Sequence, residues 1–206
     1  PKISTCPDPP SGDTMAVRHR PVTHTAYRDT MLKLLPVLLL PALVEADELR
    51  LNHTQTIGSH NSYKQAIEPA LLSMMLAADS SSAALDYAHL SLPAQLDAGL
   101  RKLELDVLHD PEGGRYAQPW ALAELRRRGH TPRPFDVEGR LQAPGFKVLH
   151  IQDLDFRTHC YTLRDCLGEL RAWSDAHPDH LPIAVSLNAK TGRADIEEGV
   201  RALPFT

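Results

Sequence analysis

Charged and apolar residues alternate along residues 101–108, RKLELDVL, so the acidic side chains and the apolar ones fall on opposite faces of an extended chain. This period of two predicts a β-strand. Three further strands are predicted at residues 49–57, 146–151 and 182–187, and the last is an apolar run expected to be buried. Apolar spacing typical of helices predicts helices between them, at residues 64–78, 93–98, 119–128, 162–176 and from 192 onward.

The strongest helix signal is at residues 162–176. Leu163, Leu167 and Leu170 recur on one helical face, and Thr162 with Asp165 has the spacing of an N-terminal cap. Strands that alternate with helices in this way predict an α/β fold with a parallel sheet. The first strand is not followed by G-x-G-x-x-G, so a dinucleotide-binding fold is not supported.

Residues 31–46 have the pattern of a secretory signal: a lysine, a short apolar run interrupted by two prolines, and a small residue, Ala46, at the cleavage point. A buried N-terminal helix is the alternative. Residues 1–30 are rich in proline and are interpreted as a disordered or mistranslated upstream extension. Residues 47–206 then form the mature domain, which is predicted to be secreted or periplasmic.

The composition is that of a globular protein, with 42% hydrophobic and 23% charged residues among 206. A net charge of −4 argues against binding to nucleic acids through a basic surface. Export would allow Cys160 and Cys166 to close a small disulfide loop. The alternative is a pair of reduced, half-buried thiols.

Polar residues gather where the predicted strands end. In a (β/α)8 barrel the catalytic groups lie at this face, so four successive strands with such ends indicate a site. The residues, in strand order, are His60 and Asn61, Glu104 and Asp106, His150, and Asn188 with Lys190.

Glu104 and Asp106 are two positions apart, so both side chains project from the same face of the strand. Two neighbouring carboxylates repel unless a cation compensates them, and Ca²⁺ would accept both together with the Asn61 amide oxygen. A solvated strand end is the alternative for the acidic pair. His60 and His150 are candidates for acid–base catalysis, and hydrogen-bonded core histidines are the alternative.

Three segments carry a resemblance to a known family: IGSHNSY at 57–63, LRKLELD at 100–106 and FKVLH at 146–150. They resemble the catalytic motifs of phosphoinositide-specific phospholipase C, and the bacterial, secreted, calcium-dependent branch is the most similar. The segment KVLHIQD at 147–153 and the pair Cys160 and Cys166 also resemble that branch. The similarity extends over residues 49–190.

The resemblance implies a TIM-barrel-like fold and a reaction in which an inositol hydroxyl attacks the neighbouring phosphorus and forms a cyclic inositol phosphate. His60 would stabilise the phosphoryl group, and His150 would protonate the departing glyceride oxygen. Asn61, Glu104 and Asp106 would hold Ca²⁺, with Glu104 also accepting the hydroxyl proton. The substrate would be a phosphatidylinositol-type phospholipid, reached at a membrane surface.

Two departures from the family pattern are visible. Asn188 stands where animal relatives have a glutamate ligand, so it would offer the metal one neutral oxygen. Eight strand–helix units need about 250 residues, so residues 47–206 are expected to form only the first half of a barrel, with open sheet edges. The alternatives are a glycerophosphodiester phosphodiesterase and an inactive secreted half-barrel that binds lipid or carbohydrate. The oligomeric state is not indicated.

Overall fold

The computed structural model describes residues 50–192, 196 and 199–205, all of which belong to the unit Glu48–Thr206. The predicted signal segment at 31–46 and the extension at 1–30 lie outside the described residues, so both stay predictions. None of the helices in the described part of the chain has the length and apolarity needed to cross a bilayer.

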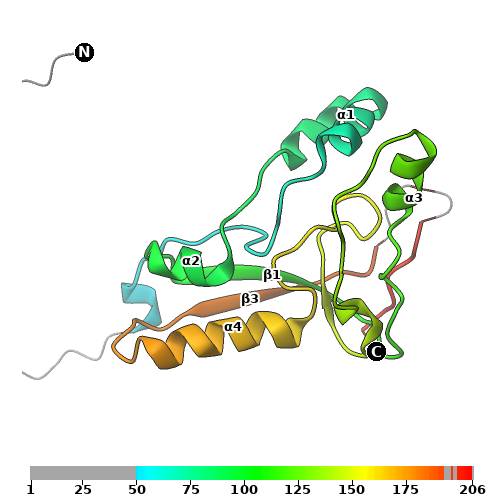
Figure 1. Cartoon of the computed structure of the whole chain (residues 1–206). Helices are drawn as coiled ribbons and strands as arrows, with labels where there is room; N and C mark the ends of the chain where they lie inside the picture. The colour runs from blue at the N-terminus through cyan, green and yellow to red at the C-terminus, as the bar shows by residue number, and fades with distance from the viewer. Residues whose placement is uncertain (1–49, 193–195, 197–198, 206) are drawn as a thin grey trace, which may run out of the picture. The chain divides into compact units, whose positions relative to one another are not determined.

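Four helical elements precede the first strand in the described chain, and strands and helices alternate after it (Figure 1). The α-helices are α1 (Pro69–Ala78), α2 (Leu92–Asp97), α3 (Trp120–Arg127) and α4 (Leu163–Ala176). The 3-10 helices are η1 (Leu51–His53), η2 (Ser80–Leu85) and η3 (Arg140–Gln142). The strands are β1 (Lys102–Leu108), β2 (Lys147–Val148) and β3 (Ala184–Ala189).

The three strands form one open, mixed sheet in the order β2-β1-β3. β1 and β3 are parallel and lie side by side in Figure 1, with the register running from Lys102↔Ala184 to Val107↔Ala189. β2 is antiparallel to the end of β1, where Val107 pairs with Val148. The prediction of an α/β fold is therefore confirmed, whereas the prediction of a wholly parallel sheet is wrong.

One face of β1 forms the main core. Leu103, Leu105 and Val107 point to this face and are buried against α2 and α4. Each such leucine contributes about 2 kcal/mol through burial of its apolar surface. The predicted helix at 162–176 is confirmed as α4, and the Thr162 hydroxyl accepts a hydrogen bond from the Asp165 amide at 3.0 Å as its cap.

The buried stripe of α4 differs from the predicted one. Leu170 is buried as predicted, but Leu167 is 45% exposed, and Cys166 and Trp173 are the other buried positions. Trp173 also donates its indole N–H to the Asp97 carboxylate at 2.7 Å, which ties the C-terminal half of α4 to the end of α2. Trp173, with Asp97 as its polar partner, thus lies on the buried face of the helix.

A second core lies between α1 and α3, with Leu71 and Leu125 among its buried side chains. The predicted helix at 64–78 begins later than expected, at Pro69. Proline disfavours a helical conformation in the residue before it, and Glu68 is extended with ψ of 136°. Residues 64–67 consequently lie outside the helix.

The predicted first strand at 49–57 is wrong as a strand. Its described residues, 50–57, contain η1 and an extended segment, and the chain meets the start of β1 at an isolated parallel bridge one residue later, Gly58↔Lys102. Its residues are mostly polar, and its apolar Ile57 is 75% exposed, so there is little apolar surface to hold a longer pairing. The segment nevertheless enters the sheet beside the start of β1.

The predicted strand at 146–151 is reduced to two residues and runs in the unexpected direction. The loop after β1 is tied to the residues before β2, because the Gly145 amide donates to the Asp110 carbonyl at 2.7 Å. The buried Lys147 ammonium also lies 3.1 Å from the Asp110 carboxylate. The chain thus re-enters the sheet at the end where β1 left it, which makes the pair antiparallel.

The strand predicted at 182–187 is present as β3 but is not buried. Leu187 is 55% exposed because β3 lies at the edge of the sheet in the described part of the chain. The helix predicted from residue 192 is also not supported. Among the described residues in that region, none is helical, and Leu203 instead forms a bridge with His109.

The disulfide expected between Cys160 and Cys166 is present, and both cysteines are buried. It closes the loop that leads from the segment beside β2 into α4. Replacing both cysteines with alanine is expected to lower the free energy of unfolding by about 2 kcal/mol, because a short cross-linked loop restricts the unfolded chain. Urea denaturation would measure this loss, and wild-type protein with a reductant should show the same one. A double variant as stable as the oxidised protein would contradict the expectation.

Candidate active site

The face of β1 opposite the core carries the predicted acidic pair. Glu104 is half-buried and Asp106 is buried, and the two side chains project together because successive strand residues alternate between faces. The alternation that buries the leucines thus places both carboxylates on the open side of the sheet.

The segment with His60 and Asn61 is held against β1 by a close backbone approach and by hydrogen bonds. A Cβ at Gly58 would lie 2.6 Å from the Lys102 Cβ, so only glycine permits this approach. The Ser62 amide donates to the Glu104 carbonyl at 3.0 Å, and the Glu104 amide donates to the Ser62 hydroxyl at 2.8 Å. Asn61, between these contacts, has a left-handed φ of 50°. The turn therefore holds a fixed position beside the acidic strand.

A buried glutamine from α2 supports this turn from behind. The Gln95 amide nitrogen donates to the Ser62 carbonyl at 2.6 Å, and its oxygen accepts from the Ser59 hydroxyl at 2.5 Å. From the sequence this residue was placed in a helix and assigned no role. Its position between the apolar Ala94 and Leu96 was the available signal.

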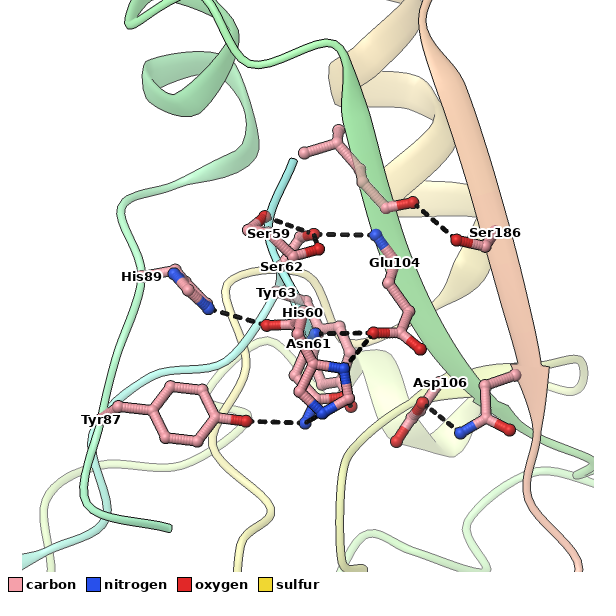
Figure 2. A network of polar contacts seen from close by, with 12 residues as sticks. Ser59, His60, Asn61, Ser62, Tyr63, Tyr87, His89, Glu104, Asp106 and Ser186 are labelled. Carbon is pink, nitrogen blue, oxygen red and sulfur yellow. Dashed lines mark hydrogen bonds and ion pairs between the residues drawn. The ribbon is translucent and has the colours of Figure 1, made fainter. Parts of the chain in front are cut away.

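His60 pairs with Glu104 at the mouth of this site (Figure 2). The His60 Nδ1 contacts the Glu104 Oε2, which also accepts a hydrogen bond from the Asn61 amide at 3.1 Å. The His60 side chain is 72% exposed, whereas Glu104 is mostly covered. The predicted histidine and carboxylate therefore act as a pair, with the imidazole facing the solvent.

Two tyrosines, neither assigned a role from the sequence, enclose Asn61. Its amide nitrogen donates to the Tyr87 hydroxyl at 2.8 Å, and its Oδ1 accepts from the Tyr63 hydroxyl at 3.4 Å. Burial raises the pKa of Tyr63 far above its usual range, and the negative charge of nearby Asp106 adds to the rise. Tyr63 consequently keeps its proton and stays a donor beside the predicted ligands.

Asp106 is held by the end of β3. Asn188 lies opposite it in the parallel register and donates its amide nitrogen to the Asp106 Oδ1 at 2.8 Å. The Lys190 ammonium lies 3.1 Å from the Oδ2, an atom that accepts no hydrogen bond from the described residues. The structure thus brings Asn188 to the acidic pair, with its nitrogen rather than its oxygen on the carboxylate.

His150 lies after β2 and is also paired with a carboxylate. Its Nδ1 is 2.8 Å from the Oδ2 of Asp155, a fully buried side chain, and 16% of the His150 side chain is exposed. The other Asp155 oxygen, Oδ1, lies 3.2 Å from the buried Lys64 ammonium. Neither Asp155 nor Lys64 was assigned a role from the sequence.

Tyr87 connects the two histidine pairs. Its carbonyl accepts from the Lys64 ammonium at 2.8 Å, while its hydroxyl contacts Asn61. Burial is the largest cause that raises the pKa of Tyr87, although the Asn61 hydrogen bond lowers it. The charges of Asp155, Asp106 and Glu104 raise it further, so all three carboxylates act on this hydroxyl. The predicted residues of both motifs therefore belong to one polar network.

The donor atoms in this network suit a hard cation. The side chains of Asn61, Glu104 and Asp106 supply oxygen atoms, which Ca²⁺ prefers. The buried Asp106 Oδ2 accepts no hydrogen bond from the described residues, and the Lys190 ammonium 3.1 Å away is the positive charge beside it. No cluster of three histidine, cysteine or acidic side chains with metal-binding geometry occurs among the described residues. The predicted set of two carboxylates and an amide therefore stays a prediction, supported by the chemistry of its oxygen atoms.

One comparison with known proteins identifies a family. The family model described as phosphoinositide phospholipase C, Ca²⁺-dependent, matches residues 49–206, which include all the site residues above. No curated protein matches the chain, and no solved structure matches it.

Proposed function

The chain belongs to the family of Ca²⁺-dependent phosphoinositide phospholipases C, and on that premise we propose that it cleaves phosphatidylinositol-type phospholipid through a cyclic inositol phosphate. It is a phospholipase C-like hydrolase with Ca²⁺ as its cofactor. The observation that carries the finer proposal is the pairing of each predicted histidine, through its Nδ1, with a carboxylate.

In the proposed reaction, a ring hydroxyl next to the phosphodiester attacks phosphorus, and the bond from phosphorus to the glyceride oxygen breaks. Glu104 accepts the hydroxyl proton, while the exposed His60 imidazole stabilises the charge on the phosphoryl oxygens. His150 donates a proton from its Nε2 to the departing glyceride oxygen. The contact between His150 Nδ1 and Asp155 supports this role, because it directs the other ring nitrogen away from the carboxylate.

Asn61, Glu104 and Asp106 would hold the calcium ion, and Asn188 stays predicted as a further ligand. When bound, the ion supplies positive charge that offsets the phosphate and lowers the pKa of the attacking hydroxyl. Asn188 and Lys190 hold the Asp106 carboxylate in place on the open face of the sheet. This fixed position supports the assignment of Asp106 as a ligand.

We further propose that this sheet is part of a TIM-barrel-like fold in a secreted protein. The parallel pairing of β1 with β3, the helix α4 before β3, and the polar residues toward the strand ends support the barrel. The disulfide between Cys160 and Cys166 supports an oxidising compartment such as the periplasm or the cell exterior.

The purified chain is expected to release cyclic inositol phosphate from vesicles of phosphatidylinositol and phosphatidylcholine in the presence of Ca²⁺. Chelation of Ca²⁺ should abolish the release, and returning the ion should restore it. The ³¹P NMR spectrum of the soluble product is the measurement, because the cyclic and open phosphates are resolved. Hydrolysis of glycerophosphocholine without a cyclic product would indicate the glycerophosphodiester alternative. Vesicle binding without turnover at any Ca²⁺ concentration would indicate the inactive alternative.

A further inference from the structure

The buried Lys64 ammonium, paired with Asp155, is a feature to which the proposed reaction assigns no step. Both side chains are fully buried, and removing charge from water is costly unless each group is well paired. The Lys64 ammonium has several partners: it donates to the Tyr87 carbonyl at 2.8 Å, lies 3.2 Å from the Asp155 Oδ1 and lies over the Tyr87 ring. The contact with Asp155 Oδ1 is an ion pair and not a hydrogen bond, and together with the Tyr87 contacts it fixes the position of the lysine.

The two oxygens of Asp155 face different partners. Its Oδ1 faces the Lys64 ammonium, and its Oδ2 faces His150 Nδ1 at 2.8 Å. A carboxylate has no donor, so the His150 Nδ1 must carry the proton in this contact. The His150 Nε2 is then the nitrogen whose proton is exchanged with the substrate.

We propose that Lys64 is a positioning residue: it fixes which end of the residue 155 side chain faces the His150 Nδ1, and so holds the Asp155 carboxylate in place against that ring. This inference rests on the proposed role of His150 as the acid of the reaction. In the wild type, the carboxylate is symmetric, so the effect of Lys64 is hidden. It becomes visible when residue 155 is an amide, which has one acceptor end and one donor end.

Asp155→Asn is the variant that makes the effect of Lys64 measurable. The Lys64 ammonium has only donors, so it draws the amide oxygen toward itself and turns the NH₂ group toward His150. The imidazole is then forced into the tautomer with its proton on Nε2, and protonation of Nδ1 is opposed. We expect kcat to fall by roughly 10³- to 10⁴-fold, as a wrong histidine tautomer does in a serine protease, while KM changes little.

Lys64→Met in the Asp155→Asn background is the rescue. Methionine has a similar length and no donor, so the amide is free to turn its oxygen to the His150 Nδ1. We expect kcat to recover by about 10-fold or more relative to Asp155→Asn alone. A purely structural role for Lys64 predicts the opposite, because a second buried change would lower activity further.

Asp110→Asn is the matched control. Asp110 is buried, and its Oδ2 lies 3.1 Å from the buried Lys147 ammonium, but its described hydrogen bonds involve no histidine. The same chemical change in an equivalent ion pair is therefore expected to leave kcat within about 3-fold of wild type, although it lowers stability. A loss as large as that of Asp155→Asn would show that any broken buried pair inactivates the enzyme, and would overturn the proposal.

The tautomer is measured directly by ¹⁵N NMR of histidine-labelled full-length chain, with the His150 signals assigned by their loss in His150→Ala. Neutral His150 should carry its proton on Nδ1 in the wild type and in the double variant, and on Nε2 in Asp155→Asn. A wild-type proton on Nε2, or a folded double variant that keeps the Asp155→Asn tautomer and rate, would overturn the inference. This readout needs no turnover, so it stands apart from the proposed phospholipase activity, and the wild-type spectrum tests the contact between His150 and Asp155 even if a variant fails to fold.

Discussion

Replacement of His60 by alanine is expected to lower the rate of phosphatidylinositol cleavage by about 10³-fold with almost no effect on folding. The His60 side chain is 72% exposed and packs against little, so its loss should change the free energy of unfolding by less than about 0.5 kcal/mol. Its catalytic contribution is expected to be large because the imidazole is fixed by Glu104 and the Asn61 turn. Steady-state cleavage of vesicles and urea denaturation would measure the two effects separately.

His130 offers the matched control for this change. It is an exposed histidine after α3, and its described contact is a backbone hydrogen bond to Leu125, so His130→Ala should leave cleavage unchanged. His150→Ala is expected to lower the rate as strongly as His60→Ala, with a larger loss of stability because the Asp155 carboxylate loses its partner. Cleavage at the wild-type rate by both His60→Ala and His150→Ala would show that the histidines are not catalytic.

Asp106→Asn is expected to weaken Ca²⁺ binding by more than about 100-fold, because changes even outside the ligand shell of a metal cost 10- to 100-fold. The asparagine oxygen still accepts from Asn188, so the position of the side chain is kept while its negative charge is removed. Lys190, which is partly exposed, should turn its ammonium into solvent. Calorimetric titration with Ca²⁺ would measure the affinity, and cleavage should be lost in parallel.

Asp153→Asn is the control for this loss of Ca²⁺ affinity, because it also removes a buried carboxylate. Asp153 is equally buried, but it accepts from the Trp120 amide at 2.9 Å and the Val200 amide at 2.6 Å, so it serves the start of α3 and the C-terminal segment. Its replacement is expected to lower stability and to leave Ca²⁺ affinity unchanged. If Asp106→Asn bound Ca²⁺ as tightly as the wild type, the assignment of Asp106 as a ligand would be wrong.

The parts of the fold that were predictable carry strong local signals. β1 shows a period of two from Lys102 to Val107, and α4 has both an apolar stripe and the Thr162 cap. The acidic pair followed directly from the β1 alternation, since Glu104 and Asp106 had to share a face. The identity of β1 as the central strand did not follow, because the sequence contains no signal for which neighbours it has.

The parts that were not predictable depend on contacts between distant segments. The direction of β2 is set by Lys147 and Gly145 meeting Asp110, and neither contact leaves a local pattern. The roles of Tyr87 and Lys64 arise because a loop after η2 returns to the turn that carries His60. Helix and strand periodicities describe which face is apolar, and they carry no information on which polar groups will meet across a site.

The alternation along β1 has a consequence for how mutations act on this molecule. One set of its side chains builds the core under α2 and α4, and the set between them supplies the carboxylates. Inserting or deleting one residue in Lys102–Leu108 would exchange the two sets, placing charge in the core and leucine in the site. The apolar core and the acidic pair therefore depend on the same register of one strand, so a one-residue shift is expected to disrupt both.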